Sequence, residues 1–390
     1  MTSAATARVD APARAARQKR PAGSRRMAPP LEHRILMTAT LCLLAFGAVM
    51  VYSASSATTL LQGRGNGSGY LIKFVTYGAI GLLLMRVLAR DGVAKVQAIT
   101  PPLLFTSFVL VLAVHVPHVG VSVNGARRWI ALGIMSVQPS EFAKVVLVVA
   151  LAALLSRRED EMDVPARTLL PVLGLVVIPA GLVLLEPDFG TALTYFAIAA
   201  AMLFYAGLPL KWFLGSALLL VPTISAWVWS AQYRRDRLLA FLHPEADPLG
   251  RGFHAIQSLI AVGTGGLTGR GLGQGKQKLF FLPYPYTDFI YAIVGEELGL
   301  IGCVAVLALF GLVFARGVRA AVNAPDSFGR LLGIGLSVMI IVQALVNISV
   351  VLSLVPTKGI PLPFLSYGGS ALWTDLLAIG ILLNLSQHAS

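Results

Sequence analysis

Apolar runs long enough to cross a lipid bilayer recur along almost the whole chain, separated by polar connections. A transmembrane helix needs about 20 mainly apolar residues. The pattern therefore predicts an all-α polytopic membrane protein with ten transmembrane helices. The expected spans are about 35–53, 70–89, 101–119, 139–156, 168–185, 190–207, 210–229, 287–315, 328–353 and 370–388.

The basic residues of the connections predict how the chain is oriented in the membrane. Residues 1–34 are rich in Ala, Arg and Pro, which predicts a disordered basic tail ahead of a transmembrane domain over 35–390. Lys and Arg favour the cytoplasmic side, and both the tail and the even-numbered connections carry them. Both termini are therefore expected in the cytoplasm. The first run is too long for a cleaved signal peptide, so a retained anchor is expected.

Composition agrees with a membrane protein, because 56% of the 390 residues are hydrophobic and only 13% are charged. The formal net charge of +13 comes from cations in the tail and the connections, so nucleic acid is not an expected partner. Cys42 and Cys303 both lie inside apolar runs, which predicts no disulfide. The six His show no metal-ligand spacing.

The outer connections carry more positive charge than the orientation rule predicts. Residues 230–286 are expected to form a long outer loop between helices 7 and 8, and two other outer connections also contain cations. Either long loops are simply exempt from the rule, or this surface binds an anionic ligand. The outer cations are Arg127, Arg128, Arg234, Arg235, Arg237, Arg251, Arg270, Lys276, Lys278 and Lys358.

A glycine-rich segment, "GTGGLTGRGLGQGKQK" from Gly263 to Lys278, lies within that loop. It is not a nucleotide-binding P-loop, because Arg270 stands where the first glycine is needed and Gln277 stands where Ser or Thr is needed. Two interpretations remain. The segment is either a flexible linker or a backbone that approaches a ligand closely, with its cations near by.

Carboxylates cluster around the start of the eighth run, in "TDFIYAIVGEELG". Asp288 is expected either to cap the helix or to act at the outer membrane edge as a general base or a metal ligand. Glu296 and Glu297 are expected about 12–14 Å deeper, at about 1.5 Å per residue. There they would form a buried ion pair, line a cavity or carry protons. Glu141 and Lys144 are spaced to pair on one helix face.

The hairpin "LLEPDFGTAL" joins the fifth and sixth runs on the outer side. Asp188 before Phe189-Gly190 predicts a turn and a helix cap. Glu186 is expected near the outer surface.

Several long motifs follow one another in a recognisable order. They are "NGARRWIALG…QPSEFAK" (124–144), "EPDFGTAL" (186–193), "HAIQSLIAVGTGGLTGRGLGQGKQKLFFLP" (254–283), "TDFIYAIVGEELG" (287–299) and "GIPLPFLSYGGS" (359–370). Together they resemble the SEDS family of bacterial cell-wall polymerases, over about 35–388. "PDFGT", "KQKLFFLP" and "VMVYSAS" are more similar to the family's division member, FtsW, than to its elongation member.

The resemblance implies a multi-pass peptidoglycan glycosyltransferase of the bacterial cytoplasmic membrane, placed at the division septum. It would polymerise lipid II, an undecaprenyl-diphosphate-linked disaccharide-pentapeptide, on the outer face. The family's essential Asp falls on Asp288, which is the expected catalytic residue. Expected substrate-binding residues are Arg128, Gln257, Arg270, Lys276, Lys358 and Ser366, and expected polar residues of the cavity are Glu141, Lys144 and Glu296.

One departure from the family pattern lies next to the expected catalytic residue. The family reads Leu-Pro-Glu-x-His-Thr-Asp, whereas Tyr284 and Tyr286 replace the Glu and the His here. A role for those two side chains in holding a metal or in tuning Asp288 is therefore in doubt. A divalent cation, Mg²⁺ or Mn²⁺, is a candidate cofactor with Asp288 as a candidate ligand, and no nucleotide is expected.

The resemblance also implies partners: the lipid-linked glycan chain, a class B penicillin-binding protein that crosslinks the strands, and other division proteins. The basic tail is suited to anionic membrane lipid or to a protein contact. Two alternatives remain open. A lipid II flippase would use Glu296, Glu297, Lys73 and Lys144 at depth, although no internal repeat supports a transporter. A non-catalytic scaffold would need neither Asp288 nor the glycine-rich segment.

Overall fold

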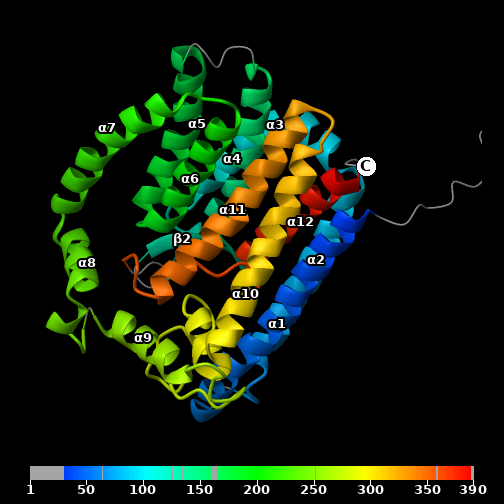
Figure 1. The fold of residues 1–390 in the computed structure, drawn as a ribbon. Helices are drawn as coiled ribbons and strands as arrows, with labels where there is room; N and C mark the ends of the chain where they lie inside the picture. Colours follow the sequence, from blue (N-terminus) through cyan, green and yellow to red (C-terminus); the bar gives the residue numbers. More distant parts are fainter. Residues whose placement is uncertain are drawn as a thin grey trace, which may run out of the picture.

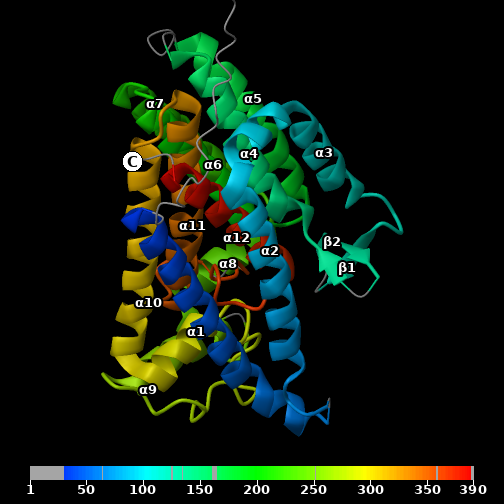
Figure 2. The same cartoon turned by 90° about the vertical axis from the view of Figure 1, so that its right-hand side faces the viewer.

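The computed structural model describes residues 30–63, 65–123, 126–133, 135–159, 165–250, 252–356 and 359–387. These residues form a helical bundle with one small sheet (Figures 1 and 2). The helices are α1 (Leu31–Leu61), α2 (Gly69–Ala98), α3 (Thr100–Ala113), α4 (Pro139–Ser156), α5 (Pro165–Leu185), α6 (Phe189–Tyr205), α7 (Leu210–Trp229), α8 (Gln232–Leu242), α9 (Phe253–Gly265), α10 (Ile290–Val322), α11 (Ser327–Val351) and α12 (Gly369–Gln387).

Helices α1 to α7 and α10 to α12 overlap the ten predicted spans. Among the described residues, seven helices are long and apolar enough to cross a membrane, or eight if one bent pair counts as a span. That pair is the end of α2 with α3, bent by 72°. Pro101 and Pro102 open α3, and proline at those positions cannot continue the preceding helix. A polytopic helical membrane protein is confirmed, while the number of ten crossings remains a prediction.

Two predicted boundaries at the start of the chain and after the third run were wrong. Helix α1 begins at Leu31, inside the predicted tail, and the rest of that tail lies outside the described residues. Helix α3 ends at Ala113 instead of 119, and an unpredicted antiparallel sheet follows. Its strands are β1 (Gly120–Val123), β2 (Ala126–Leu132) and β3 (Met135–Val137), in the order β1-β2-β3.

The core of the bundle is built around α12, which is buried along most of its length and packs against α2. The two helices approach closely at glycines. A Cβ atom on Gly380 would lie 2.7 Å from the backbone oxygen of Met85. A Cβ on Gly81 would lie 2.4 Å from Leu376. Small residues allow such contact in membrane bundles, where van der Waals packing rather than the hydrophobic effect holds helices together.

The start of α1 lies beside the end of α12, at the upper end of the bundle in Figure 1. The Nδ1 atom of His33 is 3.1 Å from the backbone oxygen of Leu383. Glu32 pairs with Arg316 at 2.8 Å and with Arg319 at 3.1 Å, near the end of α10. The described ends of the chain therefore share one face of the bundle.

The predicted outer loop, 230–286, contains regular structure that the sequence did not predict. It holds α8, a short 3₁₀ helix (Pro244–Ala246) and α9. Figure 1 shows α9 at the lower end of the bundle, opposite the end where the chain finishes.

Helix α10 reverses direction near its start, which overturns the expected depth of Glu296 and Glu297. Gly299 interrupts the helix with φ 65° and ψ −161°. The hydroxyl of Tyr291 donates to the backbone oxygen of Cys303 at 3.1 Å, although twelve residues of straight helix would separate them by about 18 Å. The first turns therefore fold back on the long part of α10. Glu296 and Glu297 lie at this reversal and not deeper along a continuous span.

Candidate active site

Asp288 lies just before α10, at the end of a loop, and does not cap the helix. The N-terminal capping position is Phe289, and no side chain makes a capping hydrogen bond there. The helix-cap interpretation of Asp288 was therefore wrong. The side chain is half-buried.

The backbone around Asp288 is held by the segment that runs from α11 to α12. The amide of Asn347 donates to the backbone oxygens of Asp288 at 2.8 Å and of Ile360 at 2.7 Å. The hydroxyl of Ser366 donates to the Thr287 backbone oxygen at 2.5 Å. The Tyr367 N–H donates to the Tyr286 backbone oxygen at 2.9 Å.

These bonds fix the backbone of Asp288 and leave its carboxylate available. None of the described residues donates a hydrogen bond to that carboxylate. A Cβ atom added to Gly359 would lie 2.9 Å from Asp288 Oδ2, so the glycine lets the carboxylate lie against the chain. Ser366, predicted as a substrate-binding residue, donates to the backbone beside Asp288, and a contact with substrate stays a prediction.

Arg128, on β2, clamps the turn between α5 and α6. Its Nε donates to the Glu186 backbone oxygen at 2.8 Å and its Nη2 to the Pro187 oxygen at 2.7 Å. Its Nη1 lies 3.8 Å from Asp188 Oδ2. Strand β2 of the unpredicted sheet therefore positions the Arg128 guanidinium next to this turn.

Asp188 and Glu186 behave differently in this turn. Asp188 caps α6 by accepting from the Thr191 N–H at 3.1 Å, as predicted, and also accepts from Gln138 at 3.3 Å. Glu186 was expected near the surface and is instead 2% exposed, which was a wrong prediction. Neither of its carboxylate oxygens has a hydrogen-bond partner among the described residues. The Arg128 clamp draws this turn inward.

Burial and neighbouring charge raise the pKa of two of these carboxyl groups into the neutral range. The pKa of Asp288 rises from 3.8 to about 7, because burial disfavours the charged form and Asp188 adds repulsion, while Arg128 partly opposes the shift. Burial and repulsion from Asp188 likewise raise the pKa of Glu186 to about 8, and Arg128 again partly opposes the shift. Asp288 therefore suits proton transfer near neutral pH.

The glycine-rich segment binds the reversal of α10. Its backbone N–H groups at Lys276 and Gln277 donate to Glu296 at 2.7 Å and 3.1 Å. Glu297 accepts from the Gly273 N–H at 3.0 Å and pairs with the ammonium of Lys278 at 2.7 Å. Both carboxylates are buried.

The close backbone approach expected of the glycines is made to protein. A Cβ atom on Gly269 would lie 2.1 Å from the Glu297 backbone oxygen, so no other residue fits there. The flexible-linker interpretation is therefore wrong for this part of the segment, and binding of a ligand by its exposed cations stays a prediction. Lys276 and Arg270 have exposed side chains, and Arg270 donates weakly to the Thr264 backbone at 3.4 Å.

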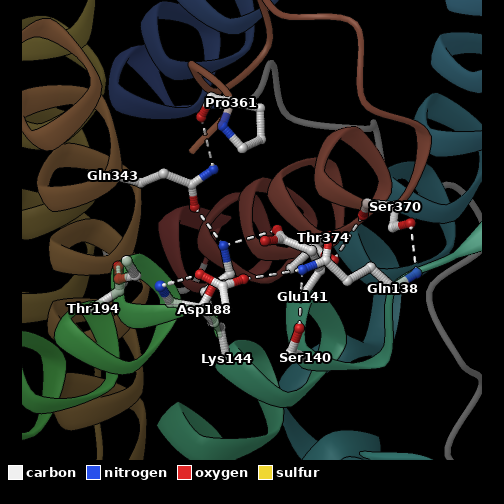
Figure 3. Close-up of polar contacts among 12 residues, drawn as sticks. Gln138, Ser140, Glu141, Lys144, Asp188, Thr194, Gln343, Pro361, Ser370 and Thr374 are labelled. Atoms are coloured by element: carbon white, nitrogen blue, oxygen red, sulfur yellow. Dashed lines mark hydrogen bonds and ion pairs between the residues drawn. The ribbon is translucent and has the colours of Figure 1, made fainter. Parts of the chain in front are cut away.

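The predicted pair of Glu141 and Lys144 lies inside the bundle. The two groups are 2.8 Å apart, and Lys144 also donates to Gln343 at 2.6 Å (Figure 3). Gln343 donates to the Pro361 backbone oxygen at 3.1 Å, which connects the pair to the segment that holds Asp288. Both charged side chains are almost fully buried.

Sequence reasoning missed the polar residues of α11 and α12. Asn347 and Gln343 support the segment around Asp288, and Asp375 is buried with no hydrogen-bond partner among the described residues. The sequence did contain an indication of them, because each is a polar or acidic residue inside a predicted span. Burying such a side chain in a membrane is costly, so it often has a function. Of the remaining predicted residues, Gln257 is half-buried on α9, and Lys358 lies outside the described residues.

A cavity of about 510 Å³ opens beside the Asp288 loop, between the end of α1 and the start of α2. Lys73 lines it and has no ion pair or hydrogen bond with any described residue. The replacement residue Tyr284 also lines it. Tyr286, the other replacement, donates to the Tyr70 hydroxyl at 2.9 Å, with the two ring centres 4.2 Å apart.

The described residues contain no cluster of three or more His, Cys, Asp and Glu side chains that could hold a metal ion. Mg²⁺ in phosphate-transfer sites commonly takes one or two carboxylates and completes its shell with phosphate oxygens and water. A cation site at Asp288 would therefore depend on substrate phosphate.

Comparisons with known proteins give a consistent result. A family model of cell cycle proteins that groups FtsW, RodA and SpoVE matches residues 34–390. A Trichlorobacter lovleyi protein named "Probable peptidoglycan glycosyltransferase FtsW" is 42% identical over 352 residues, 90% of this chain and 92% of that protein.

Two solved structures are also similar. A chain of a peptidoglycan synthase complex that coordinates polymerization and crosslinking matches with a TM-score of 0.76 and 32% identity, over 93% of this chain and 99% of that one. Thermus thermophilus rod shape determining protein RodA matches with a TM-score of 0.66 and 28% identity, over 92% and 97%.

Proposed function

This chain belongs to the FtsW–RodA–SpoVE family of cell cycle proteins, and we propose that it polymerises lipid II into glycan strands on the outer face of the cytoplasmic membrane. It is a peptidoglycan glycosyltransferase of cell-wall synthesis, similar to relatives named FtsW. Septal synthesis during division is its proposed cellular role.

The carboxylate of Asp288 carries the proposed mechanism. It accepts the proton of the 4-hydroxyl of the acceptor sugar as that oxygen attacks the anomeric carbon of the donor. The bond between that carbon and the diphosphate breaks, and undecaprenyl diphosphate leaves with the electron pair. A transition state of this kind is oxocarbenium-like, so the base needs only moderate strength. A fixed backbone with a free carboxylate supports this role.

Cations near the loop would neutralise the departing diphosphate. Lys73 is suited to this task because it lines the cavity beside the loop without a partner in the described structure. Lys278 is not, because Glu297 already neutralises it. A divalent cation, if bound, would supply further charge neutralisation, with Asp288 as a protein ligand.

The alternative function, a lipid II flippase, has less support, because the charged residues that it would use already have partners. It needed Glu296 and Glu297 as carboxylates at depth, yet both bind the glycine-rich segment at the reversal of α10. Lys144 is already paired with Glu141.

Seven helices and the bent pair of α2 and α3 give eight candidate spans. We propose that α6 and α7 also cross the membrane, so that ten spans leave both termini in the cytoplasm. The proposed partner is a class B penicillin-binding protein, supported by the similarity to a chain of a complex that couples polymerization to crosslinking. Other division proteins and membrane lipid would complete the assembly.

Lipid II polymerisation by the purified full chain with its transpeptidase tests the proposal. Wild type is expected to give a ladder of glycan strands on a gel, and Asp288→Asn none, with both proteins equally folded. Polymer from both proteins alike would remove Asp288 from the chemistry. Lipid II transport across vesicles without any polymer would instead favour the flippase.

A further inference from the structure

The loop before Asp288 contributes one ring to a cluster of aromatic side chains that joins three parts of the chain. Tyr286 lies two residues before Asp288 and is half-buried. The ring centre of Tyr367 lies 6.1 Å from that of Tyr286 and 5.1 Å from that of Tyr70. The cluster comprises Tyr70 and Tyr77 of α2, Tyr286 of the loop, Tyr367 of the segment between α11 and α12, and Trp373 of α12.

The α2 side of this cluster is fixed to the core of the bundle. The indole N–H of Trp373 donates to the Tyr77 backbone oxygen at 2.9 Å, and the two ring centres are 5.7 Å apart. A Cβ atom on Gly369 would lie 3.1 Å from the Tyr77 ring, so the chain at the start of α12 passes directly against it. Tyr70 therefore belongs to a helix that α12 holds in place.

The loop is attached to this fixed helix through the side chain of Tyr286. Its hydroxyl donates to the Tyr70 hydroxyl at 2.9 Å. The backbone oxygen of Tyr286 is held separately, because it accepts from the Tyr367 N–H at 2.9 Å. Two different elements thus hold one residue of the Asp288 loop, one through its side chain and one through its main chain.

Ring packing alone does not account for the hydroxyl contact. Tilted and edge-on contacts between rings are non-specific in direction, and phenylalanine would make them equally well. A hydrogen bond between two hydroxyls is directional and fixes both a distance and an angle. The bond between Tyr70 and Tyr286 therefore sets where the loop lies relative to α2, in addition to any packing by the two rings.

The same face of α2 carries the cation that the proposed mechanism uses. Lys73 follows Tyr70 by three residues, a spacing that places two side chains on one helix face, and both line the cavity beside the loop. In the proposed reaction Asp288 acts on the attacking hydroxyl and Lys73 acts on the departing diphosphate. Both groups must be in place in one transition state, so the loop and α2 need a fixed relative position.

This attachment depends on a residue in which the chain departs from its family pattern. Tyr286 stands where the family has His, and a histidine ring is shorter and carries no hydroxyl. A bond of this kind to Tyr70 is therefore a property of this chain and not of the family motif.

We propose that Tyr70 and Tyr286 are positioning residues, whose hydroxyl–hydroxyl hydrogen bond holds the Asp288 loop in register with α2 and its Lys73. The inference rests on the proposed function for its effect on the reaction. The bond itself, and its effect on the loop, can be tested without turnover.

Kinetics of three variants test the effect on the reaction. Tyr70→Phe and Tyr286→Phe each remove a hydroxyl and keep the ring, so kcat for lipid II polymerisation is expected to fall about three- to tenfold with little change in KM. The double variant should be no slower than either single variant, because both changes break the same bond. Tyr205→Phe is the matched control, since Tyr205 is 38% exposed on α6 and has no hydrogen bond to a described residue.

Two kinetic results would overturn the inference. One is a wild-type kcat in both single variants. The other is a double variant whose loss is the product of the two single losses, because the hydroxyls would then act independently. A fall in kcat that only matches a loss of folded protein would likewise indicate a structural role and contradict positioning.

Hydrogen exchange of the full chain in detergent, without substrate, tests the bond directly. Tyr70→Phe leaves the sequence of the loop unchanged, so peptides that cover residues 283–290 can be compared with those of wild type. Amides of residues 286–289 are expected to exchange about three- to tenfold faster in this variant, and Tyr205→Phe should leave them unchanged.

The outcome of the exchange experiment separates this inference from the proposed function. Loop exchange in Tyr70→Phe that is as slow as in wild type would overturn the inference, even if wild type makes polymer. Faster loop exchange in a protein whose wild type makes no polymer would refute the proposed function and leave the attachment of the loop to α2 standing.

Discussion

At the residue scale, Asp288 is held through its backbone, while its carboxylate accepts no hydrogen bond from the described residues. Asn347, Ser366 and Tyr367 each bind a backbone atom of the loop, and none of them neutralises the acid. Burial and the charge of Asp188 then raise the pKa of Asp288 to about 7. The position of the proposed base and its pKa therefore have separate causes.

The raised pKa of Asp288 predicts how stability depends on pH. The folded state binds this proton up to about pH 7, whereas the unfolded chain releases it near pH 3.8. The contribution of Asp288 to stability is therefore fully present below about pH 4 and is lost as the pH rises through 7. Asp288→Asn should raise the Tm relative to wild type at pH 8 and have little effect at pH 4, as measured by thermal unfolding in detergent. A lower Tm at pH 8 would contradict this environment for Asp288.

Asn347 is predicted to act as a positioning residue. Asn347→Leu leaves the backbone oxygens of Asp288 and Ile360 without their donor, at a cost of about 1–3 kcal/mol of unfolding free energy. We expect kcat to fall about tenfold or more with a smaller change in KM, because the base is displaced and not removed. Leu345→Ala, at an exposed position of α11, is the matched control. An unchanged kcat in the Asn347 variant would show that the loop is held without it.

The sequence motif identified Asp288, but the residues that hold the segment around Asp288 could not be identified from the sequence. Asn347 and Gln343 stand in an apolar run, where nothing local indicates which loop they face. Glu186 was misplaced because a charged residue in a short hairpin is usually exposed, whereas Arg128 from a distant strand pulls this turn inward.

At the element scale, the glycine-rich segment and the first turns of α10 form one unit. Backbone N–H groups of the glycine-rich segment donate to Glu296 and Glu297, and the chain reverses at Gly299, which has a positive φ. Glycines at a sharp turn and at a close backbone contact were visible in the sequence. The partner of that contact was not, because a run of helix-forming residues hides a reversal that depends on long-range hydrogen bonds.

The pair of Lys278 and Glu297 should be important for the stability of this unit. Both side chains are almost fully buried, so Lys278→Met leaves a buried carboxylate without its cation. The expected cost is about 3–5 kcal/mol of unfolding free energy, seen as a lower Tm. The double variant Lys278→Met with Glu297→Leu should recover part of that loss. A single variant as stable as wild type would contradict the pairing.

At the scale of the whole molecule, the bundle supports the outer site from within. Helix α12 packs on α2 through close contacts at glycine, and the Glu141–Lys144 pair connects through Gln343 to the segment around Asp288 (Figure 3). The long helices of the bundle were predictable because their apolar runs are long. The small sheet was not predictable from periodicity, because its strands are short and lie next to an apolar run.

The contact between α2 and α12 gives a prediction at this scale. Gly380→Val would force the helices apart at Met85, so we expect a loss of about 1–3 kcal/mol of unfolding free energy and a lower Tm. Gly311→Ala in α10 is the control, because nothing lies within 4 Å of its added Cβ, and it should be tolerated. Equal stability of both variants would argue against close packing of α2 on α12.

The dependence of the initial rate of lipid II polymerisation on pH tests whether Asp288 accepts the proton in this reaction. Wild type and Asp288→Asn are compared with the transpeptidase present. The wild-type rate should rise with pH through an apparent pKa near 7, because only the ionised carboxylate acts as a base. Asp288→Asn should be slower by about 10²- to 10⁴-fold at every pH. An Asp288→Asn variant that matches the wild-type rate would contradict the role of Asp288 as the base.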